Sequence, residues 1–237
     1  MALRSSLATW ASELRNATLD RVQLRDLGNV QSLAAYWDTL GWVTYKQGNN
    51  EKAIKYIKAS WSLDQSGEVA DHLGQIYLKQ GKKDEALKFF AQAAGAQRPP
   101  PENAGRVAAA AGIVVDAGKF DSKDADMKKK FDAVVEKYKP SLLTERTIKL
   151  SGLAQKSADA DFFILISQPG KVEAAKFVSG SDTLKTAAKP AILGVSIGNA
   201  FPDDTPTRLI RRVTVHCNDK SECSMELQVP ETITSVD

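Results

Sequence analysis

Residues 46–57 read KQGNNEKAIKYI, and residues 79–90 read KQGKKDEALKFF. The two stretches begin 33 residues apart, and the same offset relates Leu40-Gly41 to Leu73-Gly74. A fixed period of about 20 to 50 residues is the signature of a protein built from stacked repeats. The sequence therefore predicts two copies of one structural unit.

Each copy has the pattern of a helical hairpin. A stretch with apolar residues at helical spacing ends at Gly48 or Gly81, and glycine can adopt the left-handed conformation that ends a helix. A second such stretch opens with Glu51 or Asp84, and an acidic residue is favourable at a helix N-terminus. We expect two antiparallel helical hairpins.

The two copies resemble the tetratricopeptide repeat, whose pattern is W-x2-L-G-x2-Y followed by A-x3-F. The matching residues are Trp37, Leu40, Gly41 and Ala53 in the first copy, and Leu73, Gly74, Tyr77, Ala86 and Phe90 in the second. The resemblance implies repeats over about 34–66 and 67–98. It also implies that Gly41 and Gly74 lie where helices cross closely.

Two repeats bury too little apolar surface alone, because each stacks only on its neighbours. We therefore expect further helices in residues 2–16, which look like half of a preceding repeat. A degenerate capping hairpin is expected in RVAAAAGIVVDAG (106–118) and DADMKKKFDAVVEKY (124–138), with Pro140 after the last helix. The helical repeat domain is expected to span residues 1–140.

Residues 141–237 contain β-branched and alternating runs separated by turn residues, which predicts a second, strand-rich domain. Strands are expected in RTIKL, DFFILI, KVEAAKFV, TRLIRRVTVHC and SMELQV. One helix is expected in TLKTAAKPAILGV, with Ser181 or Asp182 near its N-cap, and it is expected to be interrupted or bent at Pro190. This order predicts an antiparallel sheet with one helix on a face, so the whole chain is expected to be α+β.

Residues 170–192, GKVEAAKFVSGSDTLKTAAKPAI, resemble the C-terminal domain of TonB-type energy transducers. The whole chain resembles the C-terminal part of large bacterial envelope proteins in which tetratricopeptide repeats follow a transglutaminase-like domain. That resemblance implies a non-enzymatic scaffold that binds a peptide or protein partner, within a larger exported or periplasmic bacterial protein. The alternative it implies is an accessory region that positions substrate for a transglutaminase-like or peptidase-like domain encoded upstream.

Composition argues against several other classes of protein. The 32 Lys and Arg residues are nearly balanced by 29 Asp and Glu residues, so a basic nucleic-acid-binding face is not expected. No apolar run approaches the roughly 20 residues that cross a bilayer, and the first residues are too highly charged for a signal peptide. His72 and His216 lie in no catalytic motif, and neither a cofactor nor a metal ion is expected.

Cys217 and Cys223 lie in two predicted strands on either side of NDKSE, both on the core-facing side. Folding the strands over this connection brings the two cysteines opposite one another, close enough for a disulfide bond. Buried free thiols are the alternative, and a zinc site would lack ligands because His216 faces the other side. The disulfide requires an oxidising compartment.

Arg208, Arg211 and Arg212 form a local basic cluster. The cluster could bind a carboxylate or a phosphate, or the arginines could keep a sheet edge soluble and unpaired.

The tetratricopeptide resemblance places the partner-binding groove on the first helix of each repeat. The groove residues it implies are Asp38, Trp42, Tyr45, Lys46, Asp71, Gln75 and Lys79. Trp42 and Tyr45 are aromatics that the core pattern does not require, so they could anchor a peptide or pack on the preceding hairpin or the second domain. Asp38 and Asp71 would repel the C-terminal carboxylate that chaperone-binding repeats grip.

Overall fold

The computed structural model describes residues 18–167, 170–197, 201–202 and 208–230. The helix expected over residues 2–16 lies outside the described residues. The chain divides into two compact units, one of them Ala34–Glu145 and the other formed by the residues before Ala34 and after Glu145. The first division falls inside helix α2 (Leu24–Lys46), and the second falls five residues beyond the expected boundary at 140.

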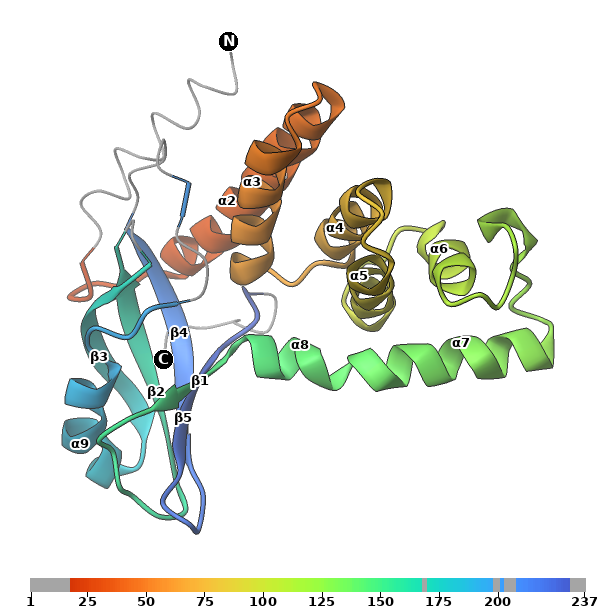
Figure 1. Cartoon of the computed structure of the whole chain (residues 1–237). Coiled ribbons are helices and arrows are strands. Elements are labelled where there is room, and N and C mark those ends of the chain that lie inside the picture. The colour runs from red at the N-terminus through yellow and green to blue at the C-terminus, as the bar shows by residue number, and fades with distance from the viewer. Residues whose placement is uncertain (1–17, 168–169, 198–200, 203–207, 231–237) are drawn as a thin grey trace. The chain divides into compact units, whose positions relative to one another are not determined.

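The helical unit contains the two expected hairpins (Figure 1). Its elements are the end of α2, α3 (Asn50–Leu63), α4 (Gly67–Lys79), α5 (Lys83–Gly95), α6 (Asn103–Ala110), η1 (Ala117–Lys119), α7 (Ala125–Tyr138) and α8 (Pro140–Glu145). Gly48 and Gly81 have φ of +87° and +74°, which confirms the predicted left-handed turns. The Asn49 side chain caps α3 by accepting a hydrogen bond from the Lys52 amide.

The hairpins cross closely at the two predicted glycines. A Cβ atom at Gly41 would lie 2.4 Å from a side-chain carbon of Ile57, and one at Gly74 would lie 2.5 Å from the ring of Phe90. Trp37 and Phe90, which match the repeat pattern, are fully buried. The repeat residues therefore form the core that their spacing predicts.

The third hairpin differs from the expected one. Its first helix, α6, ends at Ala110, because Gly112 takes a left-handed φ of +70° and turns the chain toward η1. Pro140 does not end the helical domain: it is the first residue of α8, a position where its missing N–H costs no hydrogen bond. The spacing of apolar residues did not predict that Gly112 would end α6 or that Pro140 would begin a further helix.

Glu145 at the end of α8 connects three helices of this unit. Its carboxylate accepts hydrogen bonds from Trp61 Nε1 and Gln92 Nε2, both at 2.8 Å, and pairs with Lys88 Nζ at 2.7 Å. Burial opposes the charge of this carboxyl, but the hydrogen bonds from Lys88, Trp61 and Gln92 prevail and lower its pKa. This contact holds α8 against α3 and α5.

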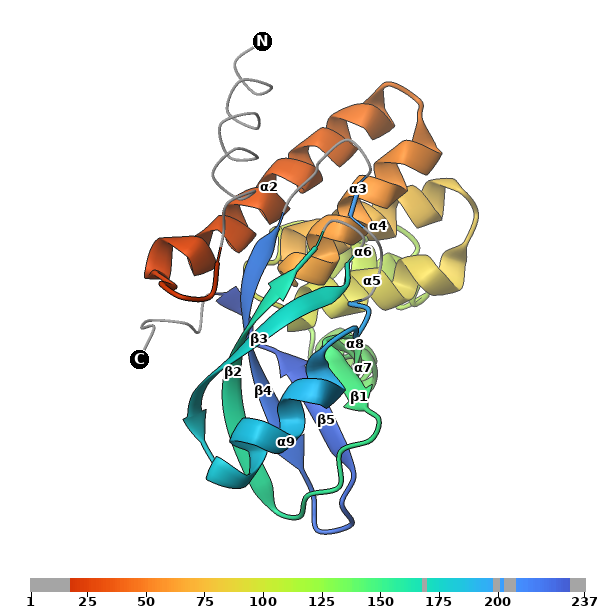
Figure 2. The ribbon, with the colours of Figure 1, turned by 90° about the vertical axis from the view of Figure 1, so that its left-hand side faces the viewer.

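The second unit is a five-stranded antiparallel sheet in the order β1-β5-β4-β2-β3, so the α+β prediction is confirmed. The strands are β1 (Thr147–Leu150), β2 (Ala158–Ile166), β3 (Val172–Gly180), β4 (Leu209–Cys217) and β5 (Cys223–Leu227). Figure 2 shows α9 (Asp182–Ile192) in front of the sheet. This helix has Ser181 at its N-cap and buries Leu184, Ala188 and Ile192, and it continues through Pro190.

A small apolar cluster joins the segment before Ala34 to this sheet. Leu19 and Leu27 pack with Phe163, Leu165 and Ile210, and all five are buried. Alternation along β2 points Phe162 and Ile164 toward the other face. The sheet therefore has apolar side chains on both faces.

Cys217 and Cys223 are directly paired across β4 and β5 and form a disulfide bond. Both are buried, as their position on the core side of the two strands predicted.

Among the described helices, we find none with the length and apolarity needed to cross a bilayer.

Candidate partner-binding face

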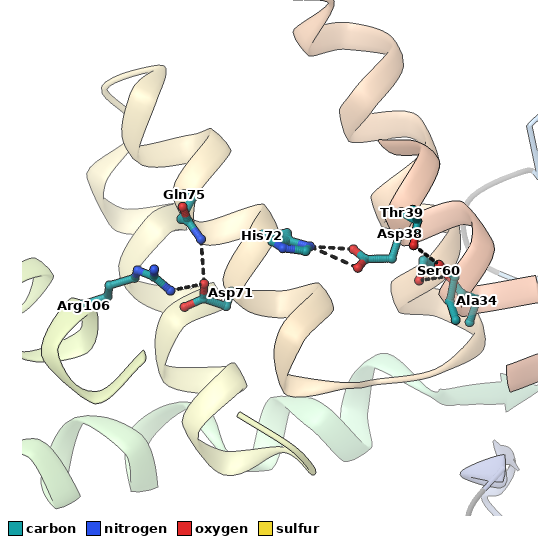
Figure 3. A network of polar contacts seen from close by, with 9 residues as sticks. Ala34, Asp38, Thr39, Ser60, Asp71, His72, Gln75 and Arg106 are labelled. Carbon is teal, nitrogen blue, oxygen red and sulfur yellow. Dashed lines mark hydrogen bonds and ion pairs between the residues drawn. The ribbon is translucent and has the colours of Figure 1, made fainter. Parts of the chain in front are cut away.

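The first helices of successive hairpins contact their neighbours: α2 contacts α4, and α4 contacts α6. Figure 3 shows polar contacts between their side chains, and Trp42 of α2 also stacks on His72 of α4. We call these side chains the first-helix face: Asp38, Trp42, Tyr45, Lys46, Asp71, His72, Gln75, Asn103 and Arg106. Most of these residues are those that the sequence assigned to the groove.

One cluster on this face connects α2 to α4. His72 Nδ1 lies 2.9 and 3.1 Å from the two carboxylate oxygens of Asp38, which is 7% exposed. The His72 ring stacks on Trp42 with 4.0 Å between centroids and 13° between planes. Tyr45 lies 5.1 Å from Trp42, and Lys46 Nζ lies 4.4 Å from the Trp42 ring centroid. Trp42 and Tyr45 are half-buried, so each aromatic packs on the core and still reaches the surface.

A second cluster connects α4 to α6 around Asp71, which is 1% exposed. Gln75 Nε2 donates to this carboxylate at 2.7 Å and Asn103 Nδ2 donates at 2.9 Å. Arg106 forms an ion pair with it. Asn103 and Arg106 were not predicted as residues of this face, because the sequence indicated only a degenerate capping hairpin here. Their i, i+3 spacing is common on helices and does not mark a binding site.

The two predicted groove aspartates are therefore engaged in contacts between neighbouring hairpins. Lys46 and Lys79, at the C-terminal ends of α2 and α4, are exposed. Because Asp38 and Asp71 are buried while Lys46 and Lys79 are exposed, the solvent-accessible charge of these four residues is mainly positive.

A pocket of about 430 Å³ opens beside the second cluster. Its wall includes Leu78, which is 47% exposed, and the side chains of Lys83 and Arg106. The remaining lining residues are small or apolar: Phe90, Ala109, Ala110, Gly112 and Ala117. An apolar cavity of this size with a few polar groups suits one or two side chains of a bound ligand.

The structure does not bring the three arginines of the C-terminal unit into one patch. Arg208 pairs with Glu173 at 3.3 Å, Arg211 is 4% exposed, and Arg212 pairs with Asp161 at 2.9 Å. Adjacent residues of a strand point to opposite faces, which separates the last two. Arg211 and Arg212 lie in strand β4, which is inside the sheet, so protection of a sheet edge does not explain these two residues either.

One group of side chains has the composition of a metal site. Asp38, Glu68 and His72 each place a potential ligand atom within 4.8 Å of the other two. The first two helices of the face supply all three residues.

Comparison with known proteins agrees with the repeat architecture. No curated protein matches the chain. Residues 68–99, which form α4, α5 and the turn after them, match the family model described as Tetratricopeptide repeat. This match supports a protein that contains tetratricopeptide repeats.

Proposed function

We propose that this protein is a non-catalytic scaffold that binds a segment of a protein partner along the first-helix face. The repeat match supports a role in protein–protein interaction, because tetratricopeptide repeats are typically non-catalytic scaffolds. The observation that carries the proposal is the open apolar pocket at Leu78, on the same helix that supplies Asp71 and His72 to the face.

The pocket also suggests the chemistry of the segment. Leu78 and Phe90 offer apolar contact, and Lys83 and Arg106 place positive charge beside it. We expect an apolar side chain in the pocket with an acidic residue close by in the partner's sequence. Trp42 and Tyr45 supply the aromatic surface that binding sites commonly use as anchors.

The test is selection of binding peptides from a displayed random library, followed by measurement of affinity by fluorescence polarisation. Leu78→Glu should weaken binding of a selected peptide about tenfold or more, since it places a charge in an apolar pocket. Leu143→Glu is the matched control, because Leu143 is equally exposed at 47% but lies outside the pocket lining. Equal affinity of both variants and the parent would refute this location.

We also propose that the protein functions in an oxidising compartment of a bacterial cell envelope. The disulfide between Cys217 and Cys223 supports this, because such bonds are rare in reducing compartments. The likeness of residues 170–192 to TonB-type domains points the same way. Protein isolated under acid quench from its native host and labelled under denaturing, non-reducing conditions should show no maleimide-reactive thiol until it is reduced. Two reactive thiols before reduction would contradict an exported protein.

A further inference from the structure

We propose that Asp38, Glu68 and His72 form a binding site for a divalent transition-metal ion, with Zn²⁺ as the representative ion. One potential ligand atom from each residue lies within 4.8 Å of the other two. Asp38 comes from α2, and the other two residues come from α4. The ion would join the first helices of two successive repeats.

The spacing of the three side chains fits a shared ion. Glu68 and His72 are four residues apart on one helix, so they occupy neighbouring positions on the same face. Zinc lies about 2.0–2.2 Å from nitrogen and oxygen ligands, so two ligands of a tetrahedral ion are about 3.3 Å apart. The 2.9 and 3.1 Å distances between His72 Nδ1 and the Asp38 oxygens are close to that value. An ion can therefore lie between the two groups in place of their hydrogen bond.

Two of the ligands are already held in place. The side chains of His72 and Asp38 are 13% and 10% exposed, so neither rotates freely into solvent. The Trp42 ring stacks on the imidazole at 4.0 Å and fixes its plane. Glu68 is exposed, so a change of its side-chain rotamer can close the remaining gap.

The donor set selects the class of metal ion. One imidazole nitrogen with two carboxylates suits Zn²⁺ and its transition-metal neighbours, whereas Mg²⁺ and Ca²⁺ prefer oxygen ligands alone. The two carboxylates balance the charge of a divalent ion. Three protein ligands leave one tetrahedral position, which water or a group from a bound partner can fill.

A hydrogen bond between Asp38 and His72 that links the two repeats is the simpler explanation of two of these residues. It gives Glu68, which is exposed, no role beyond that of an acidic residue in the first turn of α4. Glu68 is therefore the residue that separates the two explanations. Replacing it should leave the fold intact, because it is not part of the buried core.

The chain contains a natural control for the metal site. His216 pairs with Asp159 in the sheet unit, and both side chains are more than 60% exposed. Within the described part of the chain, no third metal-ligating residue joins that pair. The His216–Asp159 pair therefore serves as a control: it is a histidine–aspartate contact that lacks a third potential ligand.

The experiment is titration of the full chain with ZnCl₂ by calorimetry, together with the absorption spectrum of Co²⁺, whose visible bands report tetrahedral coordination. We expect one equivalent of Zn²⁺ to bind and Trp42 fluorescence to change as the neighbouring imidazole is ligated. Glu68→Gln should weaken binding about tenfold or more, since even residues that only support a ligand commonly contribute that much. His72→Gln should abolish binding, and His216→Gln should leave it unchanged.

Absence of saturable Zn²⁺ binding would overturn the proposal, as would parent-like affinity in His72→Gln. Parent-like affinity in Glu68→Gln would also overturn it, because it would leave only the histidine–aspartate pair. Circular dichroism of each variant shows whether the fold is kept. The titration needs no partner, so its failure is distinguishable from a failure of peptide binding at Leu78.

Discussion

Substitution of Gly74 tests the packing of the second repeat most directly. The residue lies in α4, where a Cβ atom would be 2.5 Å from two carbons of the Phe90 ring and 3.0 Å from a third. Real Cβ atoms do not approach other atoms this closely, so either the ring or the helix must move. Phe90 is fully buried in the core of the unit, which restricts its movement.

The expected cost of Gly74→Leu follows from two opposing effects. Extra carbons in a well-packed core typically destabilise by about 1–3 kcal/mol, and leucine adds four carbons here. Replacing a glycine in a helix interior recovers about 0.8 kcal/mol of helix propensity. With the overpacking cost at the high end, the free energy of unfolding should fall by about 2 kcal/mol or more. Gly74→Ala adds one carbon and should cost less.

Urea unfolding followed by far-UV circular dichroism measures this loss. For an m-value of about 2 kcal/mol/M, the midpoint for Gly74→Leu should fall by about 1 M. Gly95→Ala is the control, because a Cβ atom on this helical glycine of the same unit meets its nearest neighbours at 3.6–3.7 Å, an ordinary contact. If Gly74→Leu unfolds at the same urea concentration as the parent, the assigned helix crossing is incorrect.

Three further predictions concern two polar contacts and the disulfide bond. Asp71→Ala removes the buried acceptor of the hydrogen bonds from Arg106, Gln75 and Asn103, so it should lower the free energy of unfolding by about 3 kcal/mol. Asp71→Asn should cost less, and thermal melting of the two variants measures the difference. The lowered pKa of Glu145 means that its stabilising effect is present above its ordinary pKa of 4.5 and is lost as pH falls through the lower folded-state value. Glu145→Gln should therefore weaken the acid dependence of the melting temperature, and an unchanged dependence would contradict this contact. Replacing both Cys217 and Cys223 with serine should cost about 2 kcal/mol in urea unfolding, and no loss would show that the bond contributes nothing.

Local sequence signals predicted the repeat unit and the sheet hairpin well. Gly48 and Gly81 act within a few residues, so their left-handed turns follow from the sequence alone. The pairing of Cys217 with Cys223 likewise depends only on strand alternation and a short connection. The residues in each of these features are close in the sequence, so the backbone between them can adopt few conformations and the outcome is predictable.

Contacts between repeats were harder to predict. Asp38 and His72 are 34 residues apart, and their contact depends on how one hairpin rotates against the next. Arg106 and Asp71 are likewise 35 residues apart, so their contact depends on how α6 packs against α4. The residues that the resemblance assigned to the groove lie on the first helices α2 and α4, but the resemblance could not show that neighbouring side chains would engage the Asp38 and Asp71 carboxylates.

The engagement of these carboxylates changes the electrostatics expected for a partner. The sequence suggested that Asp38 and Asp71 would repel a C-terminal carboxylate, but Arg106 counters the charge of Asp71 and His72 hydrogen-bonds to Asp38. The side chains of Asp38 and Asp71 are also only 10% and 1% exposed, so they offer little charge to solvent. The exposed cations Lys46, Lys79 and Lys83 then add positive potential near this face, which the exposed carboxylate of Glu68 partly offsets. An acidic partner segment is therefore compatible with this face, and its association should slow as salt is added.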